Sequence, residues 1–248
     1  MHLNAVARTN VLSRLLEVYN KGDVRDRPQI QSVAREVLFD LLAADERPGT
    51  REIANICHAV GTMQIQDDKL IDNLLRCAKR MWQGFNAEDC SFMIGGLSAM
   101  PGASGKRLEN LQFCCRRLGE LAPTAKPETL LKTLQSLSLG NSYETELVET
   151  ISNKLLAEHE LRKEQRVSEC PDLHDIALLA RLTAAIQCTN SDMLDYITNE
   201  FIEALSLAEE TWQRSISPRA AANFLWGCAA ASYELPAGVV SLLQQYVL

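Results

Sequence analysis

This sequence predicts an all-α protein, a right-handed α-solenoid of about six stacked helical hairpins without a β-sheet. Three observations support the prediction. The composition combines 46% hydrophobic residues with only 6% aromatic residues, 12 glycines and 8 prolines, which favours helices over strands. Apolar residues recur at positions i, i+3, i+4 and i+7, the period of an amphipathic helix. The helical segments also repeat every 37 residues in the first half of the chain.

Twelve helices are expected, in six consecutive pairs. Breakers such as Gly61, Pro101-Gly102 and Gly140-Asn141 separate the periodic segments. Cap-like residues precede several of the helices: Thr50, Asn86, Ser104, Asn190 and Ser217. The expected helices span residues 3–20, 28–44, 50–63, 67–82, 87–100, 104–121, 127–139, 143–164, 172–187, 191–210, 217–233 and 236–247. No segment alternates apolar and polar residues between hairpin turns, so we expect no sheet.

The repeat is clearest in the middle of the first half. Val60 recurs 37 residues later as Leu97 and again as Leu134, and Leu74 recurs as Leu111. Copies in the second half are longer and recur after 46 residues. Because one hairpin cannot bury its apolar face alone, stacking of neighbouring copies supplies the burial.

Residues 1–248 are therefore expected to form a single helical-repeat array, although its charge is uneven. Residues 1–122 hold the 37-residue repeats and contain 16 Lys and Arg residues against 15 Asp and Glu residues. Residues 123–248 hold the longer repeats and contain 9 against 17, so they supply most of the formal net charge of −7. We expect any contact with a polyanion in the first half and contacts with protein in the second half.

Basic residues recur on the second helices of two consecutive pairs. Lys79 and Arg116 are one repeat apart, as are Arg80 and Arg117, so stacking would place these charges in rows. Such rows suit the phosphates of a nucleic acid and make its binding salt-dependent. The predicted RNA-binding residues are Arg76, Lys79, Arg80, Lys106, Arg107, Arg116 and Arg117. A solvated outer helix face is the alternative interpretation of the same pattern.

Residues 217–229, with the sequence SPRAAANFLWGCA, resemble the first helix of the octotricopeptide repeat and of the related heptatricopeptide and FAST-kinase-like repeats. Residues 50–60, which contain the sequence ANICHA at 54–59, look like a second copy, with His58 where the family often has Trp. The resemblance implies a mitochondrial protein, or alternatively a plastid one. It further implies contacts with organellar RNA (rRNA or mRNA) and with neighbouring protein subunits, as in a mitochondrial ribosome or an RNA-processing complex.

Two residue types of this motif invite both structural and functional interpretations. Asn55 and Asn223 occupy the same motif position, where the side chain would bond a loop backbone or face the concave surface. Trp226 and Trp82 are expected in the core or at the closure of a hairpin, rather than as platforms for stacked bases.

Catalysis, metal binding and cofactor binding have little support. The sequence lacks the patterns GxxxxGK[ST], GxGxxG, GxSxG and HExxH, so we expect no enzyme, no cofactor and no small-molecule substrate. His58, Cys57 and Cys77 are not expected to hold a metal, because adjacent helix positions point apart and nothing nearby completes four ligands. We expect the eight cysteines to be reduced and packed among apolar side chains.

The N-terminal segment and the overall function each have two interpretations. The first 16 residues contain Arg8 and Arg14 and no acid, as in a transit peptide, but their apolar spacing favours the first structural helix. No apolar run approaches the roughly 18 residues that would span a membrane, so no membrane insertion is expected. A purely protein-binding, HEAT-like scaffold or an accessory subunit of another organellar complex is the alternative to an RNA-binding function.

Overall fold

The computed structural model is all-α, as the helical period predicts. No strand occurs in the residues that the structure describes, which are 5–43, 48–100, 105–139, 145–165, 173–185, 191–211, 218–236, 238–241 and 243. Within these ranges, no helix combines the length and the apolar character needed to cross a membrane. Contacts along the chain cluster into two compact units, Met1–Leu147 and Val148–Leu248.

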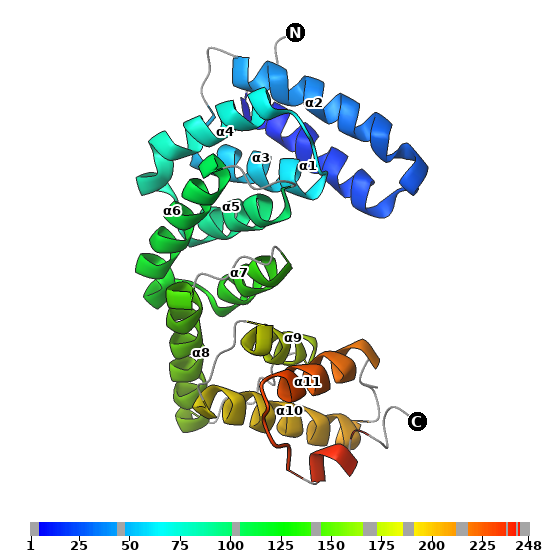
Figure 1. Cartoon of the computed structure of the whole chain (residues 1–248), viewed down its shortest axis with the longest axis vertical. Helices are drawn as coiled ribbons and strands as arrows, with labels where there is room; N and C mark the ends of the chain where they lie inside the picture. The colour runs from blue at the N-terminus through cyan, green and yellow to red at the C-terminus, as the bar shows by residue number, and fades with distance from the viewer. Residues whose placement is uncertain are drawn as a thin grey trace. The chain divides into compact units, whose positions relative to one another are not determined.

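The first unit is built from helical pairs (Figure 1). Its described helices are α1 (Ala5–Lys21), α2 (Arg27–Ala43), α3 (Thr50–Thr62), α4 (Asp68–Met81), α5 (Ala87–Ala99), α6 (Gly105–Leu121) and α7 (Pro127–Leu139). Short 3-10 turns precede α2 and follow α4 and α6, at Val24–Asp26, Trp82–Gly84 and Ala122–Thr124. The next helix, α8 (Thr145–Gln165), runs across the boundary into the second unit. That unit continues with α9 (Leu173–Ala185), α10 (Ser191–Thr211) and α11 (Pro218–Ala230).

The bounds of α1 to α11 agree with the expected ranges to within three residues at each end. Of the final expected helix, 236–247, residues 238–241 and 243 are helical, and most of the rest lies outside the described residues. Asn86 is an N-cap, as expected: its side chain accepts the N–H of Asp89 at 2.8 Å, and the Asp89 carboxylate accepts the N–H of Asn86. The expectation for Thr50 is wrong, because Thr50 is the first residue of α3 and Gly49 is its N-cap.

The other expected caps and breakers fall outside the described residues: Ser104, Asn190, Ser217, Pro101-Gly102 and Gly140-Asn141.

Among the described helices, the pairs of the first unit pack in succession. Helix α3 lies between α1 and α5, and α5 lies between α3 and α7 (Figure 1). Helix α4 packs in the same way against α2 and α6. In the second unit, α9 packs against both α10 and α11.

Glycines allow the first helices of neighbouring pairs to approach closely. A Cβ on Gly61 of α3 would lie 2.0 Å from the carbonyl oxygen of Gly96 in α5, and one on Gly96 would lie 2.2 Å from that of Cys57. Gly61, which we expected as a helix breaker, lies inside the last turn of α3, and this packing explains its lack of a side chain. In the second unit, a Cβ on Gly227 of α11 would lie 2.5 Å from the Ala180 carbonyl oxygen of α9.

The turn that follows α3 recurs after α11. Gln64 and Ser232 both have a left-handed backbone conformation, with φ of 55° and 54°. Their backbone hydrogen bonds correspond one to one, joining Gln64 to Gly61 and Ile65 to Val60 in the first turn, and Ser232 to Ala229 and Tyr233 to Cys228 in the second. Each turn closes one of the two copies of the family-like motif, so the two copies share this local structure.

The six cysteines that the structure describes have free thiols, and all but Cys77 are buried. Burial raises the pKa of Cys90 to about 12 and that of Cys228 to about 11, and it raises the pKa of Cys57 further.

Because only the thiolate reacts readily, we expect Cys57 and Cys90 to resist iodoacetamide at pH 8 until urea unfolds the protein. Mass spectrometry of tryptic peptides would measure this, with half-buried Cys77 as the internal comparison. Labelling of Cys57 as fast as Cys77 in the folded protein would contradict the expectation.

Candidate functional site

The predicted RNA-binding residues lie on α4 and α6, two helices that pack against each other in the first unit. Each helix buries one apolar stripe and leaves its other side to solvent. The buried stripe of α4 consists of Leu70, Leu74, Leu75 and Ala78, and the apolar part of the α6 stripe consists of Leu111, Cys114, Cys115 and Leu118. The basic residues occupy the remaining surface. Those that already form ion pairs or hydrogen bonds within the protein are less available to an outside anion.

Two of the seven basic residues connect the helices to each other. Lys79 of α4 lies 2.6 Å from Glu109 of α6, and Lys106 of α6 lies 2.5 Å from Asp72 of α4. The Lys79 ammonium group also lies over the Phe113 ring, 5.5 Å from its centroid. Both ion pairs are about half exposed, so each contributes at most about 1 kcal/mol to stability. These lysines are already paired within the protein, and an outside anion would compete with a carboxylate for them.

Two arginines bind backbone carbonyl groups of neighbouring segments. Arg107 donates a hydrogen bond to the carbonyl oxygen of Met100, directly after α5. Arg117 donates from Nε to the carbonyl oxygen of Phe85 at 3.4 Å and pairs with Glu120 at 2.8 Å. The Arg117 side chain is consequently only 26% exposed. Both residues hold α6 against the preceding segments, a role that the sequence pattern does not reveal.

The remaining three basic residues, Arg76, Arg80 and Arg116, are exposed, and none has an ion pair or a hydrogen bond within the described residues. Arg76 and Arg80 are four residues apart and therefore share one face of α4. Trp82 follows Arg80 and stacks on Phe113 of α6 at 5.8 Å, while Arg116 lies one turn beyond Phe113. Arg80 and Arg116 thus lie at the same end of the α4–α6 pair. We refer to these three exposed arginines, Arg76, Arg80 and Arg116, as the arginine surface.

Each of the two predicted rows therefore retains one unpaired arginine. In the predicted row of Lys79 and Arg116, Lys79 is paired and Arg116 has no partner among the described residues. In the row of Arg80 and Arg117, Arg117 is paired and Arg80 has no such partner. An exposed guanidinium group can bind phosphate through two parallel hydrogen bonds. Since no carboxylate must first be displaced, the arginine surface is the part of α4 and α6 best suited to an anionic ligand.

A second polar cluster lies between α3 and α5. Arg51 lies 3.3 Å from both Glu88 and Asp89, and its guanidinium group lies over the Phe92 ring at 5.0 Å. His58 meets the same ring edge-on, with centroids 5.2 Å apart. Burial lowers the pKa of His58, so the ring is neutral at pH 7. No group of three or more His, Cys, Asp or Glu side chains able to hold a metal ion is found within the described ranges.

Trp226 does not lie in the core, one of its two expected positions, because 53% of it is exposed. Arg181 of α9 lies over the Trp226 ring at 5.9 Å and donates a hydrogen bond to the Asn223 side chain at 3.4 Å. The Asn223 side chain therefore bonds another side chain. Trp82 is half-buried after α4, outside the fully buried core, and it stacks on Phe113 of the next pair.

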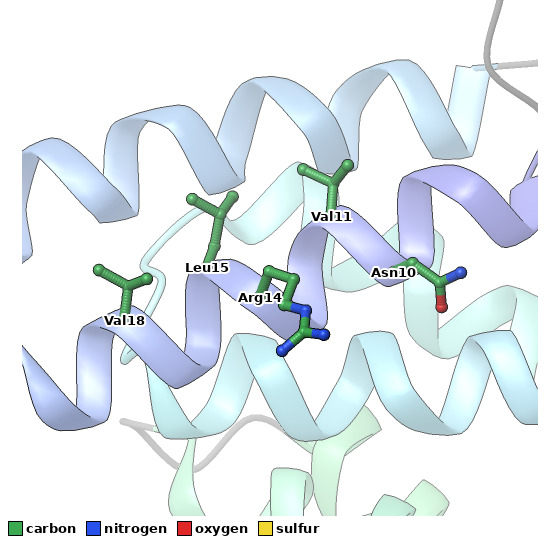
Figure 2. A pocket seen from close by; sticks show the side chains of 5 residues that line it. All are labelled: Asn10, Val11, Arg14, Leu15 and Val18. Atoms are coloured by element: carbon green, nitrogen blue, oxygen red, sulfur yellow. The ribbon is translucent and has the colours of Figure 1, made fainter.

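A shallow apolar groove follows α1, with a volume of about 310 Å³. Figure 2 shows Val11, Leu15 and Val18 projecting from one side of the helix, with Asn10 and Arg14 beside them. Val11 and Val18 are 37% and 54% exposed. The i, i+4, i+7 spacing of these residues predicts a helix correctly, but it does not reveal that this stripe faces away from the core. We name this feature the α1 groove.

No protein-family model matches the chain, and no curated protein matches it significantly. The chemistry of three surfaces is therefore the basis for assigning a function. The arginine surface suits phosphate groups, the α1 groove suits an apolar helix, and the Arg181–Trp226 pair offers an exposed aromatic ring beside a cation.

Proposed function

We propose that this chain is a non-catalytic helical-repeat protein that binds RNA through the arginine surface of α4 and α6. The observation that carries the proposal is the exposure of Arg76, Arg80 and Arg116 without an ion pair in the described part of the chain. An RNA phosphate displaces only water and counterions from such groups, and counterion release favours binding. The four other predicted residues, Lys79, Lys106, Arg107 and Arg117, fix the two helices relative to their neighbours, which orients the surface.

The architecture that we propose is a right-handed α-solenoid of about six stacked hairpins. Support comes from the first unit, where α1, α3, α5 and α7 pack in succession and α2, α4 and α6 do the same. The identical turns after α3 and α11 support a repeated unit in both halves of the chain. Stacked repeats present an extended surface, which suits a long ligand such as RNA.

A mitochondrial RNA–protein complex is the proposed setting, either a ribosome or a complex that processes RNA. Residues 217–229 support this setting, because they resemble the octotricopeptide and related repeats. The ligand would be organellar rRNA or mRNA, and a plastid is the alternative location. The formal net charge of −7 favours a protein that shares the binding of RNA with neighbouring subunits.

A protein-binding scaffold is the second candidate function, and the α1 groove favours it. Exposed valine and leucine side chains at helical spacing suit an apolar helix of another protein. Residues 148–248 contain 7 Lys and Arg residues against 14 Asp and Glu residues, a balance that repels RNA and is compatible with protein contacts. Both functions are compatible in one molecule, since they use different surfaces.

Reversal of charge at Arg76, Arg80 and Arg116 tests the RNA-binding proposal. We expect R76E/R80E/R116E to bind a single-stranded RNA of about 20 nucleotides at least tenfold more weakly, with a salt slope smaller by about 2, because three phosphate contacts are lost. Fluorescence anisotropy over a range of salt concentrations measures both quantities. The matched control is K132E, which reverses an exposed charge on α7. Unchanged affinity in the triple variant, or an equal loss in K132E, would overturn the assignment of the surface.

Nuclease treatment of the native complex separates the two candidate functions. If RNA is the main ligand, digestion releases the chain from the complex, and the triple arginine variant fails to enter it. If the chain is a protein scaffold, it stays bound after digestion, and the triple variant assembles normally. Sedimentation of the complex before and after digestion distinguishes these results.

A further inference from the structure

A groove between α2 and α4 combines an exposed aromatic ring with several carboxylates. Its volume is about 420 Å³. The groove is lined by Arg35, Glu36, Phe39, Asp40, Asp67 and Leu70. None of these residues belongs to the arginine surface or to the α1 groove, so the feature is separate from the surfaces described above. We name it the Phe39 groove.

Phe39 is the most exposed large hydrophobic side chain in the described part of the chain, with 69% of its surface open to solvent. Helix α2 directs Ile30, Ala34 and Leu38 into the core, and Phe39, the next residue after Leu38, lies about 100° further around the helix. Leu70, which is 5% exposed, gives the groove an apolar base. A phenyl ring in this position adds little to folding, and a ligand that covers it gains from removing the ring from water.

The groove is lined by three carboxylates and one guanidinium group, a formal charge of −2. Glu36 and Asp40 are exposed and have no ion pair among the described residues. Asp67 is the N-cap of α4, and its carboxylate accepts the N–H of Leu70 at 3.1 Å. Arg8 of α1 binds the backbone carbonyl of Asp40 at 2.7 Å, which leaves the Asp40 carboxylate available. Glu36 and Asp40 thus lie near an open aromatic ring without an ion-pair partner in the described residues, and Arg35 is the one cation that lines the groove.

We propose that the Phe39 groove binds an arginine side chain from a basic segment of a partner protein. A guanidinium group is flat, so it stacks on a phenyl ring while its N–H groups reach carboxylates at the edge. Phe39 supplies the ring, and Glu36 and Asp40, three residues before and one residue after it on α2, supply the carboxylates. The proposal is independent of RNA binding, because it uses no residue of the arginine surface.

The chemistry of the groove disfavours RNA, a purely apolar helix and a lysine side chain. RNA would bring phosphates towards Glu36, Asp40 and Asp67, which repel them. A purely apolar helix would cover exposed carboxylates without pairing them, which costs free energy. A lysine would satisfy the carboxylates, but it is a compact ion that stacks less well than arginine on an aromatic ring. The formal net charge of −7 also draws a basic segment towards the protein as a whole.

Binding of a short peptide to the full chain tests the proposal. The probe is a fluorescein-labelled peptide in which three arginines alternate with glycine and serine, and the comparison peptides carry lysine or the neutral isostere citrulline. We expect the arginine peptide to bind best, and F39A and F39L each to weaken it by about threefold, as the loss of an exposed cation–π contact predicts. D40N should weaken binding, whereas E128Q, which removes an exposed carboxylate on α7, should not.

Five outcomes decide between this proposal and its competitors. A loss in F39L, with the far-ultraviolet circular dichroism of the wild-type protein, supports ring stacking rather than simple apolar contact. Equal affinity for the citrulline peptide, or unchanged binding in F39A and F39L, overturns the proposal. RNA binding that depends on Phe39 also overturns it in favour of a nucleic-acid site. Peptide binding that survives in R76E/R80E/R116E supports the proposal even if RNA binding proves absent.

Discussion

Replacement of Gly96 with alanine is expected to destabilise the first unit by about 2 kcal/mol, a typical cost of overpacking a core. In most helices this change has the opposite sign, because alanine favours the helix over glycine by about 1 kcal/mol. Here the added Cβ would lie 2.2 Å from the carbonyl oxygen of Cys57 and 2.7 Å from the backbone nitrogen of His58. Backbone atoms of a helix cannot rotate out of the way, so α3 and α5 must separate.

Urea unfolding followed by circular dichroism measures the loss of stability, and hydrogen exchange shows where it occurs. Amides of α3 and α5 should exchange faster in Gly96→Ala, whereas those of α10 should not change. The matched control is Gly105→Ala at the exposed start of α6, where a Cβ would meet no atom within 4 Å. Equal stability of the two variants would show that α3 and α5 tolerate a wider spacing than the glycine contact indicates.

Replacement of Asp89 with alanine should be nearly as damaging, at about 2 kcal/mol, because hydrogen bonds to a buried charged group are lost. The Asp89 side chain is 2% exposed and lies 3.3 Å from Arg51 of α3. It also accepts the backbone N–H of Asn86, which completes the capping box of α5. One carboxylate thus stabilises both the start of α5 and its contact with α3.

Two further variants separate these two roles in the same unfolding experiment. Asp89→Asn keeps a side-chain oxygen for the cap but removes the charge that faces Arg51, so it should lose about half as much stability. Glu88→Ala removes only a half-exposed partner of Arg51 and should cost less than about 1 kcal/mol. If Glu88→Ala proves as destabilising as Asp89→Ala, burial of Asp89 does not decide the effect.

The helices could be predicted from the sequence because their cause is local. Apolar residues at helical spacing have one stable arrangement, and a cap such as Asn86 depends only on residues within the same turn. Glycines such as Gly61 and Gly96 could not be interpreted in this way. A glycine near the end of a helix has the same appearance whether it breaks the helix or admits a neighbour, and only the contact between α3 and α5 distinguishes the two.

The sequence predicted where the basic residues lie, but it did not predict which of them are paired with a carboxylate. Periodicity predicts that Arg76, Lys79, Arg80 and Arg116 face solvent on α4 and α6, as they do. The carboxylate that pairs with Lys79 lies 30 residues further along the chain, on α6, and no spacing rule identifies it. Trp226 shows the converse problem, since a large aromatic residue within a buried motif is usually part of the core.

The matching turns after α3 and α11 have an evolutionary consequence. Their hydrogen bonds join backbone atoms, so most mutations at the bonded positions leave them intact. Even the left-handed residue differs, being Gln64 in one turn and Ser232 in the other. Selection can therefore preserve the direction in which the chain leaves the first helix of a repeat, while the amino acids at these positions change during evolution. Ancestral copies of one unit could diverge beyond recognition in sequence and still stack on one another.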